Sequence, residues 1–269
     1  MSGTPVVAVD SDLNFEDALV VTCFPSTGFV SSIVAHFLVD RLGLKFAGGA
    51  RGPGLPPVCL VQEGKPLPPL RFYAGEPICN VERCDKIVLI ASEIQVTAEM
   101  SLPMSDAILD WVEENGAAQM IMIDSYSHGP EQSHSIFDDD ESDESLLGIA
   151  STDAAHEVLS NLEVPMLKHG VVAGMTGVML GECRRRRIDA MAIMAESGDE
   201  IANGAIPDAR AAARIIKALD GLLPAIKLDP EPLLKEAQRI EEQIREMMKI
   251  QLNNLQKEKS SGESSAMFG

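Results

Sequence analysis

The chain has 269 residues, of which 45% are apolar, and a formal charge of −19 from 22 basic and 41 acidic residues. This length can bury a full core, either as one large domain or as a domain with an appendage. The negative charge disfavours sequence-independent binding to nucleic acid or to an anionic membrane, and favours binding to a basic protein surface.

The first 18 residues have neither the basic flank nor the continuous apolar region of a signal peptide. The longest apolar stretches, such as "HGVVAGMTGVMLG", are broken by glycine and are shorter than the ~20 residues that cross a bilayer. We therefore expect a cytoplasmic protein without a membrane span.

The five cysteines are scattered, and most lie in apolar runs, as reduced core thiols do. Cys79 and Cys84 could hold half of a metal site. No second pair and no matching histidine follows them at zinc spacing, so we expect no metal and no cofactor.

Strand and helix patterns alternate from the N-terminus. The run "ALVVTC" is typical of a strand, "FPSTG" of a tight turn, and the spacing of Phe29, Ile33 and Phe37 of a helix that ends near Gly43. The runs "PVCLV", "LRFYAG" and "KIVLIAS" predict further strands, with "GGARGPGLPP" and "EGKPLPP" as turns between them.

The second half continues the alternation. Helices are predicted at about 100–116 and 152–162, in the glycine-rich "HGVVAGMTGVMLGECRRRR" and in "IPDARAAARIIKALDGLL". The runs "AQMIMIDS" and "IDAMAIMAE" predict buried strands. This order favours an α/β layer fold with a mostly parallel sheet.

We expect the α/β domain to span residues 1–229. A long helix with an apolar stripe would follow at 230–258, and a flexible tail at 259–269. The stripe favours packing against the domain or pairing between subunits. Within the domain, residues 126–148 contain the acidic run "DDDESDE", which is typical of an exposed, mobile loop.

A cation site in the acidic run is the alternative interpretation, because Asp138, Asp139 and Asp140 supply oxygen ligands. The run lacks the alternating spacing of a calcium loop, so we favour the exposed loop. The run Arg184–Arg187 predicts a solvated helix end, with binding of an acidic partner as the alternative.

Standard motifs for hydrolases, zinc proteases and nucleotide binding are absent from the sequence. Weaker candidates follow the predicted strands, where ligands bind in open α/β sheets. Cys23, Ser26, Asp124, Ser125 and His128 could form a nucleophile and base. The structural alternative, which we favour, is that Cys23 is a core residue and Ser26 belongs to a turn or helix cap.

The segment "LVVTCFPSTGFVSSIVAHFLVDRLGL" resembles the N-terminal signature of the proteasome assembly chaperone 2 family, a strand, "GFPDAG" and a helix. It departs from that pattern at Cys23 and at Ser26-Thr27. The segment from "HGVVAGMTGVMLGECRRRR" to "LLKEAQRIEE" resembles the C-terminal half of the family. Together the two segments cover most of residues 16–250.

The resemblance implies a three-layer αβα domain similar to phosphorylase/hydrolase-like folds, followed by a long C-terminal helix. It also implies a homo-oligomer or a pairing with a related paralogous chain. The implied role is non-enzymatic: binding the α-subunits of the 20S proteasome as an assembly chaperone or activator. A small-molecule hydrolase or phosphorylase with a site at the strand ends remains the alternative.

Proteasome-binding chaperones and activators often end in a hydrophobic residue, a tyrosine and any residue. Met267, Phe268 and Gly269 resemble this tripeptide, with phenylalanine in the tyrosine position. We therefore expect these three residues to form the partner-binding site.

Overall fold

The computed structural model describes residues 4–53, 55–76, 86–127, 146–197, 207–222 and 229–235. The acidic run, most of the predicted C-terminal helix and the tail lie outside these ranges. The predicted boundaries at 229 and 258 therefore stay predictions.

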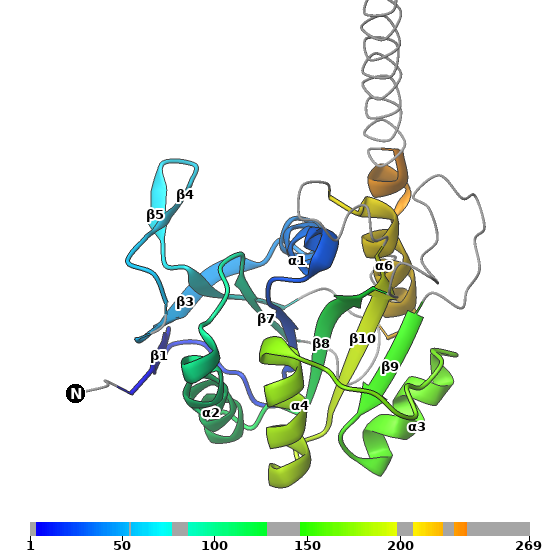
Figure 1. Cartoon of the computed structure of the whole chain (residues 1–269). Coiled ribbons are helices and arrows are strands. Elements are labelled where there is room, and N and C mark those ends of the chain that lie inside the picture. The colour runs from blue at the N-terminus through cyan, green and yellow to red at the C-terminus, as the bar shows by residue number, and fades with distance from the viewer. Residues whose placement is uncertain are drawn as a thin grey trace, which may run out of the picture.

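A single eight-stranded sheet forms the centre of the molecule (Figure 1). Its strand order is β1-β3-β6-β7-β2-β8-β10-β9. In chain order the strands are β1 (Val6–Val9), β2 (Leu19–Cys23), β3 (Lys45–Arg51), β6 (Leu70–Gly75), β7 (Ile87–Ser92), β8 (Gln119–Tyr126), β9 (Leu146–Ala150) and β10 (Ala190–Glu196).

The parallel part of the sheet is its middle. The strands β7, β2, β8 and β10 run parallel, whereas β1, β3 and β6 at one end and β9 at the other pair antiparallel. The parallel strands are almost entirely buried, as continuous apolar runs between two helical layers should be. The predicted α/β fold is confirmed, with a mixed sheet whose centre is parallel.

Helices cover both faces of the sheet and make three layers (Figure 1). Residues that alternate along the strands, such as Val20 and Val21, enter opposite cores. On one face lie α1 (Val30–Arg41), α3 (Asp153–Asn161) and α6 (Ala209–Leu222), and on the other α2 (Ala98–Glu114) and α4 (Gly174–Arg186).

The strand β3 lies where the sequence favoured a glycine-rich turn. A Cβ atom at Gly48 would lie 2.3 Å from the carbonyl oxygen of Ala8, and one at Gly49 would lie 2.5 Å from Cγ of Pro68. The glycines therefore allow neighbouring backbone to approach β3 closely, a role that only the pairing partners reveal.

A two-stranded hairpin extends from this end of the sheet (Figure 1). It consists of β4 (Leu60–Gln62) and β5 (Lys65–Leu67), joined by Glu63 and Gly64 with φ of 51° and 76°. Positive φ at both central residues is typical of the type I′ turn that closes tight hairpins.

The predicted C-terminal helix begins within the described residues. Residues 231–235 are helical, and Leu233 packs against the core on the α1 side. This contact agrees with the predicted apolar stripe. The remaining positions of that stripe lie outside the described residues.

Candidate functional site

The strand-end candidates lie on two neighbouring parallel strands. Cys23 ends β2, and Asp124 and Ser125 lie near the end of β8, which pairs with β2. Sequence reasoning therefore placed these residues correctly at one edge of the sheet. His128 lies outside the described residues.

Cys23 is a core residue. Its side chain is almost completely buried in the core on the α1 side of the sheet. Burial raises the pKa of the Cys23 thiol strongly, and the carboxylates of Asp124 and Glu93 raise it further. A thiol with a raised pKa is a poor source of the thiolate that a cysteine nucleophile requires.

The serines hold the turn that follows β2. The Ser26 hydroxyl accepts a hydrogen bond from the Ser31 amide at 3.0 Å, and the Ser125 hydroxyl donates to the Thr27 carbonyl at 2.9 Å. The amide of Asp208 donates to the Gly28 carbonyl at 2.8 Å. These bonds fix a turn whose residues Gly28 and Phe29 both have positive φ.

Asp124 belongs to the opposite face of the sheet. Its carboxylate accepts hydrogen bonds from the Ser125 amide at 2.8 Å and from the Thr176 side chain in the first turn of α4. Burial raises the pKa of Asp124, and these two hydrogen bonds partly oppose the rise. A carboxylate at this place complements the positive end of the α4 dipole.

The polar strand-end groups thus have structural partners. Within the described ranges, the hydroxyls of Ser26 and Ser125 and the carboxylate of Asp124 bond to turns and helix ends, and no hydrogen bond joins a candidate nucleophile to a base. The hydrolase alternative gains no support from this geometry.

A charged network nearby was missed by sequence reasoning. Arg71 of β6 is only 2% exposed, and its Nη2 lies 2.5 and 2.6 Å from the two carboxylate oxygens of Glu93. Arg71 also donates to the Tyr73 hydroxyl at 3.0 Å, and His36 of α1 lies 3.2 Å from Glu93. The network joins β6, α1 and the segment after β7.

The pKa values of this pair follow its geometry. Burial alone would raise the pKa of Glu93, but hydrogen bonds from His36 and Arg71 lower it to about 2. Glu93 in turn raises the pKa of Arg71 against the opposing effect of burial. The only sequence signal for this pair is an arginine inside the apolar run "LRFYAG".

The arginine run lies at the end of α4, and three of its residues, Arg184, Arg185 and Arg187, are exposed, as the predicted solvated helix end requires, but the run also has partners within the protein. Arg186 lies 2.6, 2.5 and 2.9 Å from Asp106, Asp110 and Glu113 of α2. Arg184 donates to the Ser151 carbonyl at 2.8 Å, and Arg185 pairs with Glu182. Arg187, with φ of 63°, ends α4. Arg184 and Arg186 therefore connect α4 to its neighbours.

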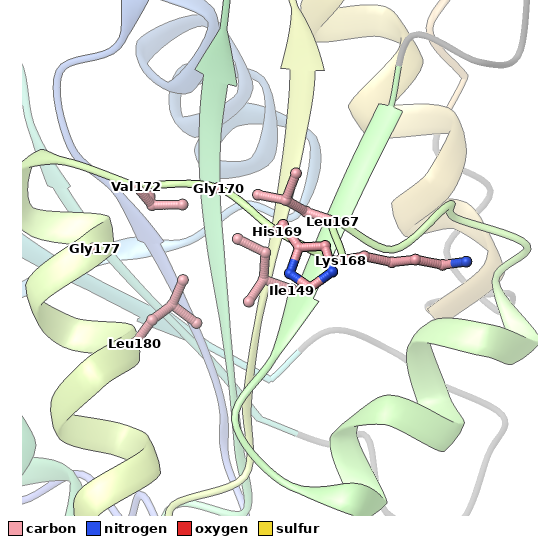
Figure 2. A pocket seen from close by; sticks show the side chains of 8 residues that line it. All are labelled: Ile149, Leu167, Lys168, His169, Gly170, Val172, Gly177 and Leu180. Carbon is pink, nitrogen blue, oxygen red and sulfur yellow. The ribbon is translucent and has the colours of Figure 1, made fainter.

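A shallow pocket of about 280 Å³ lies elsewhere, between α4 and the edge strand β9 (Figure 2). Figure 2 shows the His169 ring near Ile149, whereas the amine of Lys168 points away from the pocket. The other lining residues are apolar or glycine: Leu167, Gly170, Val172, Gly177 and Leu180. The pocket has room for an apolar group but brings no second catalytic group to His169.

In the part of the chain that the structure describes, no group of three His, Cys, Asp or Glu side chains is placed to hold a metal ion. The possible ligands Cys79, Cys84 and Asp138–Asp140 lie outside it. Across the same ranges, no helix is both long and apolar enough to span a bilayer. The predicted partner-binding residues Met267, Phe268 and Gly269 also lie outside the described residues.

The structure is that of a three-layer α/β protein in which the polar groups at the strand ends support the scaffold. The sequence profile of the PAC2 family matches residues 20–248. The chain belongs to the PAC2 family, which confirms the resemblance seen in the sequence.

An uncharacterized protein of Methanocaldococcus jannaschii is 29% identical to this chain over 246 residues, which are 91% of each of the two chains. A crystal structure of Pyrococcus furiosus PbaA, described as an archaeal homolog of proteasome-assembly chaperone, is similar with a TM-score of 0.76 and 27% identity. The match covers 98% of this chain and 99% of PbaA.

A second Pyrococcus furiosus protein, PbaB, is described as an archaeal proteasome activator. It has a TM-score of 0.74 over 91% of this chain and 99% of its own. At 20% identity this likeness concerns the fold alone.

Proposed function

We propose that this chain is a non-enzymatic, proteasome-binding protein that acts as an assembly chaperone or activator of the 20S proteasome. The observation that carries the proposal is the match to PbaA, which extends over 98% of this chain at 27% identity. Membership of the PAC2 family supports it independently. A fold by itself would not, because one scaffold hosts many functions.

The hydrogen bonding and burial of the strand-end residues support a binding role rather than catalysis. Ser26, Asp124 and Ser125 are engaged in holding a turn and a helix end, and the Cys23 thiol is buried. A protein that binds through its surface needs no such groups free, whereas a hydrolase of the kind considered would need a nucleophile and a base in contact.

The proposed docking element is Met267-Phe268-Gly269. It combines an apolar side chain, an aromatic ring and, in a chain that ends at Gly269, a carboxylate that can pair with a lysine between α-subunits. The preceding segment "SSGESSA" has the composition of a flexible linker, which suits the presentation of a short anchor.

Self-association is part of the proposal. One tripeptide buries little surface and should bind weakly. Several tails on one homo-oligomer that faces a ring of α-subunits would gain effective concentration without any new contact.

The test is capture of cognate 20S proteasome by immobilised protein. We expect capture by the full-length chain and none by a chain that lacks Met267–Gly269. A matched control lacks Ser260–Gly262 instead, which shortens the tail equally but keeps the tripeptide, and should still capture the particle. Equal capture by all three would show that the tripeptide is not needed.

Capture by none of the three, although each is folded by circular dichroism, would refute proteasome binding itself. The deletion should scarcely change the free energy of unfolding, because the serine-rich composition of the tail is not that of a core segment.

A further inference from the structure

Exposed apolar side chains concentrate on two adjoining surfaces. Among the described residues, eight large apolar side chains are exposed. Four of them lie on β1, β3, the hairpin and the segment that joins β3 to the hairpin. We call this surface (residues 6–9 and 45–67) the basic end. The four are Val6, Phe46, Val58 and Val61, with exposed fractions from 46% to 69%. Two more, Leu13 and Leu102, lie in the segment before β2 and in α2.

The charge of the basic end is opposite to that of the chain. It contains Lys45, Arg51 and Lys65 against the single acidic residue Glu63, in a chain with a formal charge of −19. All three cations are exposed. In the described ranges neither an ion pair nor a side-chain hydrogen bond engages them, in contrast to Arg71, Arg184, Arg185 and Arg186.

The neighbouring surface has the complementary charge. Residues 10–17 and 97–117, which we call the acidic surface, contain nine acidic residues and no basic one. The two segments lie together, because the Phe15 ring packs on Trp111 of α2 at 5.1 Å between centroids and the Asp17 amide donates to the Gly116 carbonyl at 3.0 Å. Arg186 engages three of these nine carboxylates and leaves the others available.

The basic end is also incompletely covered by helices. Of β1, β3 and β6, only β6 contributes a buried side chain, Tyr73, to the described core on the α1 side. Phe46 packs edge-on against Tyr73 at 6.2 Å between ring centroids, yet remains 47% exposed. Figure 1 shows β1 and the hairpin at one end of the sheet, with α2 in front of that end.

We infer that the basic end and the acidic surface form an interface between two copies of this chain. In a two-fold pair, the basic end of one protomer lies against the acidic surface of the other, and the second pair of surfaces meets in the same way. Adjoining patches of opposite charge, each with exposed apolar side chains, are self-complementary under this symmetry. The occupant is a second copy, because this chain itself carries the surface that complements the basic end.

This inference rests on the self-association that is part of the proposed function, but its test needs no proteasome. The molar mass of the purified full-length chain is measured by light scattering at micromolar concentration and low salt. One variant, Arg51→Glu with Lys65→Glu, reverses the basic end, and a second, Asp12→Lys with Glu114→Lys, reverses exposed positions of the acidic surface. We expect either variant alone to dissociate with a constant raised roughly tenfold or more, because like charges then meet.

An equimolar mixture of the two variants should restore the wild-type mass, because the reversed surface of one variant then meets the reversed surface of the other. A control with Lys168→Glu and Lys217→Glu makes the same change in net charge as the first variant at exposed positions outside both surfaces, and should keep the wild-type mass. Added salt should weaken the wild-type pair, since exposed charges are screened.

A monomeric wild type, unchanged masses of both variants, or a mixture that stays dissociated would overturn the inference. If the variants keep their mass but lose capture of the 20S particle, the basic end contacts the proteasome and the self-association interface is wrong. Loss of mass with retained capture would support the interface whether or not the tail proposal holds.

Discussion

Glu93 is the residue on which three elements depend, because Arg71 of β6 and His36 of α1 both contact its carboxylate. A cation as deeply buried as Arg71 is costly to leave without its anion. We therefore expect the Arg71–Glu93 ion pair to stabilise the contact between β6, α1 and the segment after β7, and no sequence motif predicts this pair.

We predict that Glu93→Gln lowers the free energy of unfolding by about 2 kcal/mol near neutral pH, since the carboxylate is partly exposed and its pairing energy is screened. Because folding lowers the pKa of Glu93 from 4.5 to about 2, its contribution is full above about pH 4.5 and is lost as the pH falls toward 2. Urea unfolding of both proteins at several pH values measures the difference.

The exposed Glu157→Gln serves as the control and should change the free energy of unfolding by less than about 0.5 kcal/mol at any pH. A Glu93→Gln effect that is constant from about pH 7 to about pH 3 would contradict the assigned linkage.

The strand β3 contains glycines that have a low propensity for strands but are needed for its pairing. Two adjacent glycines weaken a strand, yet Gly48 and Gly49 are required here because β1 and Pro68 approach too closely for a side chain. The same strand carries Phe46 and Arg51 of the basic end, so its position also determines the proposed interface.

Replacing Gly48 by alanine should destabilise the fold by about 1–3 kcal/mol, because the new Cβ would lie 2.3 Å from the Ala8 carbonyl oxygen. The matched control is Gly181→Ala in α4, where nothing lies within 4 Å of the added atom. Alanine there should be neutral or stabilise by up to about 1 kcal/mol, because glycine is a poor helix former.

Hydrogen exchange of the β1 amides gives a second measurement, and should show faster exchange in Gly48→Ala alone. A Gly48 variant as stable as the wild type would show that β1 and β3 do not pair as closely as described.

At the scale of the whole molecule, the proposed function requires the α/β domain, the C-terminal extension and self-association. In this proposal, the domain supplies the surfaces for self-association, and the tail supplies a weak anchor whose binding strengthens when several copies act together. Binding to the particle should therefore depend steeply on oligomer formation.

Substitutions at Phe268 should separate pocket filling from hydrogen bonding. Phe268→Ala should weaken capture of the 20S particle, because the aromatic anchor is lost, and a residue added after Gly269 should weaken it by displacing the carboxylate. Phe268→Tyr should preserve or strengthen capture if the pocket offers its hydroxyl a partner. Titration of immobilised 20S particles measures all three, and an alanine variant that binds as well as the wild type would argue against an aromatic anchor.

The sequence by itself determined the fold class and the family, because both depend on local periodicity and on long segments of characteristic residues. The runs "LVVTC", "IVLIAS" and "AMAIMAE" are apolar throughout and became the buried parallel strands β2, β7 and β10. Helices α1 and α2 followed from apolar spacing, and α6 from an alanine-rich run that opens with Pro207 and Asp208.

The strands β1, β3 and β9 were not predicted, since short edge strands such as β1 and β9, and a glycine-containing strand such as β3, gain their stability from partners far away in the sequence. The strand β5 was not predicted either, because the run "EGKPLPP" that contains it favoured a turn. The strand-end residues do not form a nucleophile and base, for a related reason. Asp124 and Ser125 are adjacent in sequence, but consecutive strand residues face opposite sides of the sheet, so they bond to α4 and to the turn after β2 respectively. Only the tertiary structure decided these partners. It likewise decided that Arg71 pairs with Glu93 and that Arg186 pairs with carboxylates of α2. The physical reason is that side-chain pairing depends on which elements pack together.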